Sequence, residues 1–358
     1  MKNRIILLVI VLAFVAVIAC AFLYYNNGLK AVKEGNGEDI IVKIEEGTGV
    51  TGIARLLEEN KVIRDQDIMK IYCRLNNVRG LQAGTYKLNN GENLKTILGH
   101  ISNGEVYKDS VKITFVEGKN MRYYAKQIAA NTNNTEEDVF NLLKDEKYID
   151  SLIEKYWFLT DEIKDEEIFY PLEGYLLPDT YEFESKDVSV ETIFNVILNY
   201  MDKYLSQYKD TEMPNGITIH QMLTFASIAE LEGETEEDRA EIVGVFWNRL
   251  ALKMPLGSDV TTYYAFGVDM GERNLTKKEI YTYSPYNTRH KDMGGKIPIG
   301  PICNPSKTAI EAAVHPKETN NYYFVADKNK KVYFTQNNDE HEKKIQELKS
   351  QGLWFTYE

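Results

Sequence analysis

The stretch Phe225-Ala226-Ser227-Ile228-Ala229-Glu230-Leu231-Glu232-Gly233-Glu234 places acidic side chains at the end of an apolar segment. Thr218, followed three residues later by Gln221, forms a capping-box pattern, so a helix is expected from Thr218 to about Leu231. Thr235 is expected to cap the next helix, and Gly233 separates the two. The sequence therefore predicts a helical centre with a carboxyl group close to a helix end.

A helix would place Glu230 on the same face as Met222, Ala226 and Ala229. Burial of that face raises the pKa of a carboxyl group, and the negative end of the helix near Gly233 acts in the same direction. A carboxyl that is protonated near neutral pH can act as a general acid in glycosidic cleavage. The alternative is a solvated or ion-paired glutamate, the commoner outcome at a helix end.

Glu232 is predicted to play a lesser part. It follows Glu230 by two residues, about 200° around a helix, and should point away from the partners of Glu230. We interpret it as a solvated side chain at the helix end.

The regions around this centre combine strands and helices, so the predicted fold class is α+β. Residues 40–45 and 84–88 read as strands, with two amphipathic helices between them and a further helix near 94–101. This β-α-α-β order resembles a LysM-type module, a fold that often binds glycan. Near the end of the chain, 322–326 and 332–334 read as a hairpin.

A weak internal repeat appears at an offset of 71 residues. Glu46-Gly47 recurs as Glu117-Gly118, and the flanking strand and helix patterns recur with it. The repeat predicts two related units, the second interrupted near 145–170, although chance similarity is the alternative. The expected organisation is a cytoplasmic tip and membrane helix (1–25), a linker (26–39), a LysM-like subdomain (40–104), a second αβ unit (105–185) and a catalytic domain (186–358).

Residues 5–25 form an uncharged and almost wholly apolar run of the length that spans a bilayer core. Lys2 and Arg4 precede it, and the positive-inside tendency then predicts a cytoplasmic N-terminus with the remainder outside. A lipoprotein-like processing site, with Cys20 as the lipid anchor, is the competing interpretation.

Composition excludes several classes of function. The net charge is −12 and the basic residues are scattered, which argues against a nucleic-acid-binding protein. Three cysteines and five dispersed histidines do not form a recognisable disulfide framework or metal motif. We expect Cys73 and Cys303 to be buried thiols.

Several ordered segments resemble the MltG/YceG-like endolytic murein transglycosylases. They are Glu230-Leu231-Glu232, Arg239, and residues 172–181, 245–250, 254–261, 264–267, 284–288, 300–305, 323–327 and 340–341. The chain departs from the family pattern at Gly257, where Gln is frequent, and in a longer loop at 289–296.

The resemblance implies that Glu230 is the catalytic acid and base. It would protonate the glycosidic oxygen between N-acetylmuramic acid and N-acetylglucosamine, and then accept the proton of the muramoyl C6 hydroxyl as a 1,6-anhydro ring closes. No metal and no cofactor are implied. The implied partners are nascent glycan strands and the peptidoglycan synthases that make them.

Polar residues in the same segments are expected to bind substrate. They are Glu173, Ser258, Asp259, Thr261, Tyr286 and Asn287. Two other functions stay open: a muramidase-type hydrolase, which would require a second carboxylate such as Asp259, and a non-catalytic wall-binding scaffold.

Overall fold

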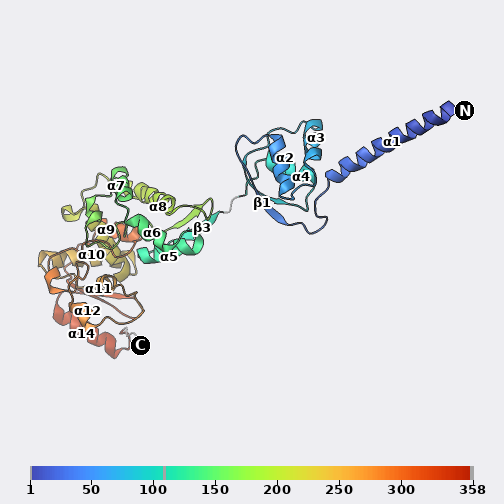
Figure 1. The fold of residues 1–358 in the computed structure, drawn as a ribbon. Coiled ribbons are helices and arrows are strands. Elements are labelled where there is room, and N and C mark those ends of the chain that lie inside the picture. Colours follow the sequence, from blue (N-terminus) through green and yellow to red (C-terminus); the bar gives the residue numbers. More distant parts are fainter. Residues whose placement is uncertain (1, 108–109, 355–358) are drawn as a thin grey trace. The chain divides into compact units, whose positions relative to one another are not determined.

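A computed structural model describes residues 2–107 and 110–354, and the chain divides into two compact units, Met1–Asp109 and Ser110–Glu358 (Figure 1). Each unit has its own buried hydrophobic core. The predicted boundary at residue 104 therefore lies close to the boundary between the units.

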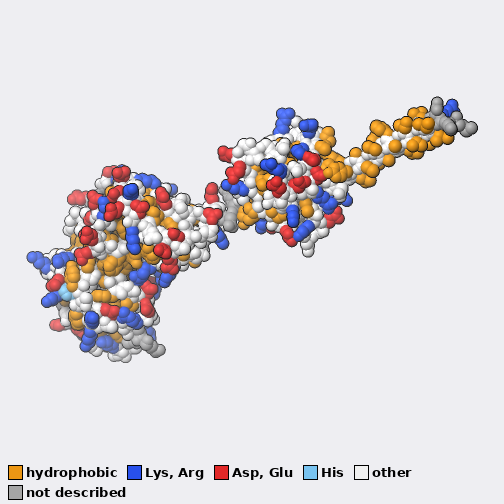
Figure 2. All heavy atoms as spheres, viewed as in Figure 1, with side chains coloured by type: hydrophobic (Ala, Val, Ile, Leu, Met, Phe, Trp, Pro, Cys, Tyr) orange, Lys and Arg blue, Asp and Glu red, His pale blue; other side chains and the backbone are white. Residues whose placement is uncertain are grey.

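The first unit begins with helix α1 (Lys2–Gly28). From Arg4 to Gly28 this helix is long and apolar enough to cross a membrane, and its side chains are mostly exposed. Figure 2 shows apolar side chains along α1, whereas charged side chains are mixed over the surfaces of both units. Cys20 is exposed on this helix.

The remainder of the first unit confirms the predicted order of elements. It contains β1 (Asp39–Ile44), α2 (Val50–Glu59), α3 (Gln66–Leu75), β2 (Gly84–Asn89) and α4 (Leu94–Ser102). β1 and β2 pair antiparallel, with Asp39 opposite Asn89 and Ile44 opposite Gly84. Alternate strand residues such as Val42 and Tyr86 are buried against the helices. The LysM-like assignment of this unit stays a prediction.

The second unit begins with the same order of elements. It contains β3 (Val111–Thr114), α5 (Met121–Asn131), α6 (Glu136–Leu143), α7 (Glu146–Lys155), the 3-10 helix η1 (Asp161–Lys164) and β4 (Thr180–Phe183). β3 and β4 pair antiparallel, from Val111 opposite Phe183 to Thr114 opposite Thr180. This agrees with the predicted repeat, in which α7 and η1 occupy the predicted interruption.

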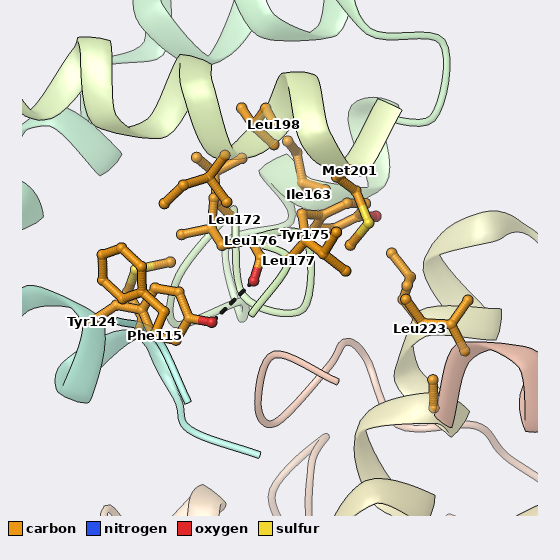
Figure 3. Close-up of a cluster of buried hydrophobic side chains, with 14 of the residues drawn as sticks. Phe115, Tyr124, Ile163, Leu172, Tyr175, Leu176, Leu177, Leu198, Met201 and Leu223 are labelled. Atoms are coloured by element: carbon orange, nitrogen blue, oxygen red, sulfur yellow. Dashed lines mark hydrogen bonds between the residues drawn. The ribbon is translucent and has the colours of Figure 1, made fainter. Parts of the chain in front are cut away.

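The core of this region is shared with helix α8 (Val190–Leu205), as Figure 3 shows. Tyr124 stacks on Phe115 with ring centroids 4.4 Å apart and donates a hydrogen bond to the Leu176 carbonyl at 3.1 Å. Leu198 and Met201 of α8 belong to the same buried cluster. The boundary predicted at residue 185 therefore falls inside one compact unit, because both sides of it contribute to a single core.

The helical centre of the unit consists of α9 (Ile219–Glu232), α10 (Glu236–Ala251) and α13 (Lys307–Val314), which pack against one another. Thr218 and Thr235 form the capping boxes that begin α9 and α10. α9 is buried on all sides from Met222 to Ala229, so the expectation of a single buried face is wrong. Its sequence is apolar all round, which is typical of a helix enclosed by other elements.

The remaining elements surround these three helices. They are η2 (Ser206–Tyr208), η3 (Pro214–Gly216), α11 (Asp259–Ala265), α12 (Lys277–Tyr281), η4 (Lys291–Met293), β5 (Tyr323–Ala326), β6 (Val332–Thr335) and α14 (Asn338–Ser350). β5 and β6 form the predicted hairpin. Cys73 and Cys303 are buried free thiols, as expected.

Candidate active site

The last turn of α9 presents two carboxyl groups to two different surroundings. Glu230 contacts residues of α10 and the start of α13, whereas Glu232 contacts the start of α11. The predicted divergence of the two side chains is confirmed. The predicted solvation of Glu232 is wrong, because its side chain is partly buried and hydrogen-bonded.

Glu230 is held by donors on both of its oxygens. Arg239 Nη2 lies 3.1 Å from Oε1, and the Ser306 backbone N–H donates to Oε2 at 2.9 Å. The Ser306 hydroxyl also donates to Oε2. The side chains of Glu230 and Arg239 are 7% and 15% exposed, so this is a largely buried ion pair. These bonds suit an acceptor-only carboxylate.

Local sequence explains how these donors reach Glu230. Gly233 ends α9, and a Cβ atom there would lie 2.8 Å from Arg239 Cγ, so the absence of a side chain lets Arg239 pass closely. Ser306 is the N-cap of α13, where its hydroxyl accepts from the Ala309 N–H. The first N–H groups of a helix have no helical partner and favour an anion, which is the role that Glu230 fills.

Glu232 accepts one hydrogen bond, from the Ser258 hydroxyl to Oε1 at 2.6 Å. Ser258 occupies the N-cap position of α11 but its side chain makes no capping bond, because the hydroxyl is directed to Glu232. The Thr288 hydroxyl accepts from the Ser258 N–H at 2.9 Å, and Thr261 donates to the Ser258 carbonyl at 2.7 Å. These bonds fix the Ser258 backbone, and thereby the direction of its hydroxyl.

Burial raises the pKa of Glu232 to about 7, and the nearby Asp259 carboxylate contributes in the same direction. The Ser258 hydrogen bond and the charges of Arg289 and Arg249 oppose this rise. A carboxyl with this pKa can hold a proton and release it near neutral pH, which is the property expected of a general acid.

Two arginines occupy the surroundings of Glu232. Arg249 donates to the carbonyls of Leu256 and Tyr322, both at 2.6 Å, and its guanidinium lies 5.1 Å from the Tyr323 ring centroid. Arg289, from the longer loop, forms an ion pair with Asp259. Both cations are therefore engaged by groups other than Glu232. Their charges lower its pKa by less than burial raises it, so the pKa of Glu232 stays raised.

His341 lies beside Tyr323, and the centroids of the two rings are 5.3 Å apart. Burial lowers the pKa of His341, and the Arg249 charge acts in the same direction. Its Nδ1 atom is buried without a hydrogen-bond partner among the described residues. A neutral imidazole is the form that these surroundings favour.

Five of the six residues expected to bind substrate are internal, and their contact with substrate stays a prediction. Glu173, Ser258, Thr261, Tyr286 and Asn287 are at most 2% exposed. Asp259 is exposed and paired with Arg289. The buried five hold the protein's own backbone and side chains, because loops brought into a core must have their polar groups satisfied.

Asn287 and Tyr286 illustrate this internal role. Asn287 donates to the Thr282 carbonyl at 2.7 Å and accepts from the Thr262 hydroxyl at 2.7 Å. The Tyr286 hydroxyl accepts from the Phe169 N–H at 3.3 Å. Both residues therefore close the loop between α12 and η4.

Glu173 is a second buried carboxyl with a raised pKa, away from Glu232. It accepts from the Met121 N–H at 2.9 Å, the Tyr264 hydroxyl at 3.1 Å and Asn304 Nδ2 at 3.2 Å. Burial raises its pKa to about 8. It joins α5, α11 and the segment before α13, and its predicted contact with substrate stays a prediction.

A groove with a volume of about 370 Å³ lies beside the end of α9. Leu231, the residue between the two glutamates, lines it together with Gly118 and Val260. Gly118 has a φ of +70°, and a Cβ atom there would lie 3.5 Å from Glu230 Cγ. The Glu-Gly turn noted in the sequence repeat therefore approaches the carboxyl pair.

Within residues 2–107 and 110–354, no group of three His, Cys, Asp or Glu side chains is arranged to hold a metal ion. The contacts that sequence reasoning missed are those of Ser306 and Arg289. Ser306 follows a segment that was recognised, and its N-cap pattern was a usable signal. No local sequence pattern identifies Arg289, whose ion pair with Asp259 is a tertiary contact.

Comparisons with known proteins agree on one family. The sequence pattern of the YceG-like family matches residues 42–347. An endolytic murein transglycosylase of Bacillus subtilis is 36% identical over 328 residues, which cover 91% of this chain and 89% of that protein. One of Streptococcus pneumoniae is 30% identical over 90% of this chain, which spans 61% of its length.

A solved structure agrees with these sequences. The 2.6 Å crystal structure of a YceG-like protein from Listeria monocytogenes matches with a TM-score of 0.61 and 33% identity, over 86% of this chain and 99% of that one.

Proposed function

The chain belongs to the YceG-like family, and we propose that it is an endolytic lytic transglycosylase that cleaves murein strands between N-acetylmuramic acid and N-acetylglucosamine. The enzyme class, a lyase-type murein transglycosylase, follows from relatives that share most of the chain. The observation that carries the proposed mechanism is the partly buried Glu232 carboxyl, whose pKa is raised to about 7 and which follows Leu231, a residue that lines the groove.

We assign the proton transfers to Glu232. In the first step its carboxyl gives a proton to the glycosidic oxygen as the bond from C1 of muramic acid breaks. In the second step the resulting carboxylate takes the proton of the C6 hydroxyl as that oxygen bonds to C1. The proton returns to Glu232, no water is consumed, and the product carries a 1,6-anhydro ring.

The assignment of the acid to Glu230 stays a prediction, and the contacts support Glu232 instead. Both Glu230 oxygens are occupied by Arg239 and Ser306, so donation of a proton from Glu230 would first require these bonds to break. Glu232 has a single neutral donor, and Ser258 leaves its other oxygen free of side-chain hydrogen bonds among the described residues.

A hydrolase would instead activate water with a second carboxylate. The charge of Asp259 raises the pKa of Glu232, but the Asp259 carboxylate forms an ion pair with Arg289. This pairing favours a mechanism with one carboxyl. Because a hydrolase would produce reducing muramic ends and a lyase 1,6-anhydro ends, the products distinguish the two reactions.

We propose that α1 crosses the membrane with its N-terminus in the cytoplasm, since Lys2 and Arg4 precede the apolar run. The catalytic unit would then meet glycan strands outside the membrane, close to the synthases that extend them. The LysM-like unit would contribute affinity for glycan. External protease should digest residues 110–358 in cells with permeabilised walls, and protection would contradict this topology.

The test of the function is mass spectrometry of fragments released from purified murein by the full chain. We expect internal cleavage with 1,6-anhydromuramic ends, and no release by the E232Q variant. Reducing ends from the wild type would change the reaction to hydrolysis. Absence of cleavage by the wild type would contradict the proposed function.

A further inference from the structure

The groove beside the carboxyl pair has a basic wall that the proposed proton transfers do not use. Lys119, Arg122 and Lys126, at the start and along the first turns of α5, line it. Arg122 and Lys126 are four residues apart and so project from the same side of the helix. Lys119 lies with its ammonium 5.8 Å from the Tyr123 ring centroid, on the same wall.

This wall is positively charged in a chain whose net charge is −12. Asp269 also lines the groove, and it is paired with Arg122 at 2.9 Å. Lys119 and Lys126 are exposed and have no carboxylate partner in the described part of the chain. Two positive charges are therefore available in the groove that Leu231, at the end of α9, also lines.

Apolar side chains line the same groove. They are Leu231, Val260, Val268 and Ile302. The groove thus suits a ligand that has an uncharged body and also carries carboxylate groups. A compact inorganic anion would leave the apolar side chains without a partner.

We propose that Lys119 and Lys126 bind the carboxylates of the peptide stem that muramic acid carries, and thereby place the adjoining glycosidic bond at the end of α9. The inference rests on the proposed function. While the stem is attached, the lactyl group of muramic acid is an amide and the sugars bear no charge, whereas the stem peptide carries carboxylates. The basic residues of this groove, which Leu231 of α9 also lines, therefore suit the stem.

The experiment measures binding by the full chain carrying E232Q, so that the strands stay intact. The probes are glycan strands from sacculi with their stems, and the same strands with the stem carboxylates converted to methylamides. An amidase would not serve, because it frees the lactyl carboxylate of muramic acid. Neither probe carries the lipid pyrophosphate, the other anion of a nascent strand. K119E/K126E is compared with K144E/K186E, which makes the same charge change at exposed lysines outside the groove lining.

We expect amidation of the stem carboxylates to weaken binding at least about ten-fold, since charge-assisted hydrogen bonds are the strong ones. K119E/K126E should lose about the same factor on strands with free stem carboxylates and almost nothing on amidated strands. The K144E/K186E control should bind as the parent does. Melting temperatures of all variants check the fold, and K126A alone provides a milder probe if the double variant does not fold.

Equal losses on both probes would overturn the proposal, because the lysines would then contact sugar. Equal binding of both probes by the parent would overturn it too. Cleavage by the wild type with 1,6-anhydro ends decides the proposed function separately. A stem preference without such cleavage would remove the function and keep the binding site.

Discussion

The two sides of the last turn of α9 offer different hydrogen-bond donors to a carboxyl group. Toward α10 and α13, Glu230 meets a guanidinium and the first N–H of a helix. Toward α11, Glu232 meets one hydroxyl, with burial raising its pKa to about 7. From this comparison we propose that identical residues two positions apart serve different roles, Glu230 in a buried ion pair and Glu232 as the proton carrier, according to the donors that the fold brings to them.

The largest expected effect is on catalysis by E232Q. The amide cannot give and recover a proton, and general acid–base catalysis contributes about 10²–10⁴-fold in rate. Because one residue serves both steps, we expect a loss at the upper end of this range. The measurement is the rate of formation of 1,6-anhydro ends from purified murein.

E230Q is the matched control for this experiment. Wild-type turnover in E232Q would contradict the assignment. So would an E230Q variant that folds with unchanged stability and is inactive, since the acid would then be Glu230, as the sequence pattern alone predicted.

The second effect is on the stability of E230Q. The amide offers one acceptor where three donors converge, and it leaves the Arg239 charge without a partner. Breaking a buried ion pair at one partner costs about 3–5 kcal/mol, so we expect a loss in the free energy of unfolding of about 3 kcal/mol, with partial exposure reducing it. Urea denaturation at pH 7 measures it.

A double variant sharpens this prediction. E230Q/R239M removes both members of the pair, and it should recover part of the stability that E230Q loses. If E230Q unfolds at the same urea concentration as the wild type, Glu230 has no structural role and the contrast between the two carboxyls fails.

Local signals predicted the elements that build this site. The capping boxes at Thr218 and Thr235, the late hairpin and the strand order of the first unit all depend on residues close together in sequence, and all are present. The end of α9 was predicted within one residue, because Gly233 marks it. Helical geometry also predicted that the two glutamates diverge.

The partners of each carboxyl come from distant parts of the sequence and could not be predicted from it. Ser258 and Ser306 lie 26 and 76 residues from the glutamates that they contact. The same limitation applies to the residues expected to bind substrate. Asn287 and Glu173 are polar residues in recognised segments, and only the packed structure shows the loops and helix ends that they contact.

A third effect is the pH dependence of stability in E232Q. The folded wild type keeps the Glu232 proton up to about pH 7, whereas the unfolded chain releases it near its ordinary pKa of about 4.3. The wild type therefore loses stability as the pH rises from about 4.5 through 7, by about 4 kcal/mol at most, and the cost stays constant above 7.

The amide carries no such cost. E232Q should match the wild type near pH 4.5 and exceed it at pH 8, and the difference between the two proteins removes the similar slope that Glu173 contributes to both. Denaturation curves at several pH values test this. A difference that is constant over pH would mean that Glu232 titrates alike in the folded and unfolded states.

The smallest effect expected is a shift in the pH profile of S258A. Ser258 donates to the Glu232 carboxylate and so lowers its pKa, and alanine removes that hydroxyl alone. The backbone bonds of Ser258 to Thr288 and Thr261 remain, and α11 keeps its start because the hydroxyl never capped it. The pKa of Glu232 should therefore rise further.

Since the acid must be protonated to act, activity is lost as the pH rises through this pKa, and the alkaline limb of kcat/KM should move up by about 0.5–1 pH unit. A fall in kcat/KM with an unmoved limb would mean that Ser258 serves the substrate and not the carboxyl.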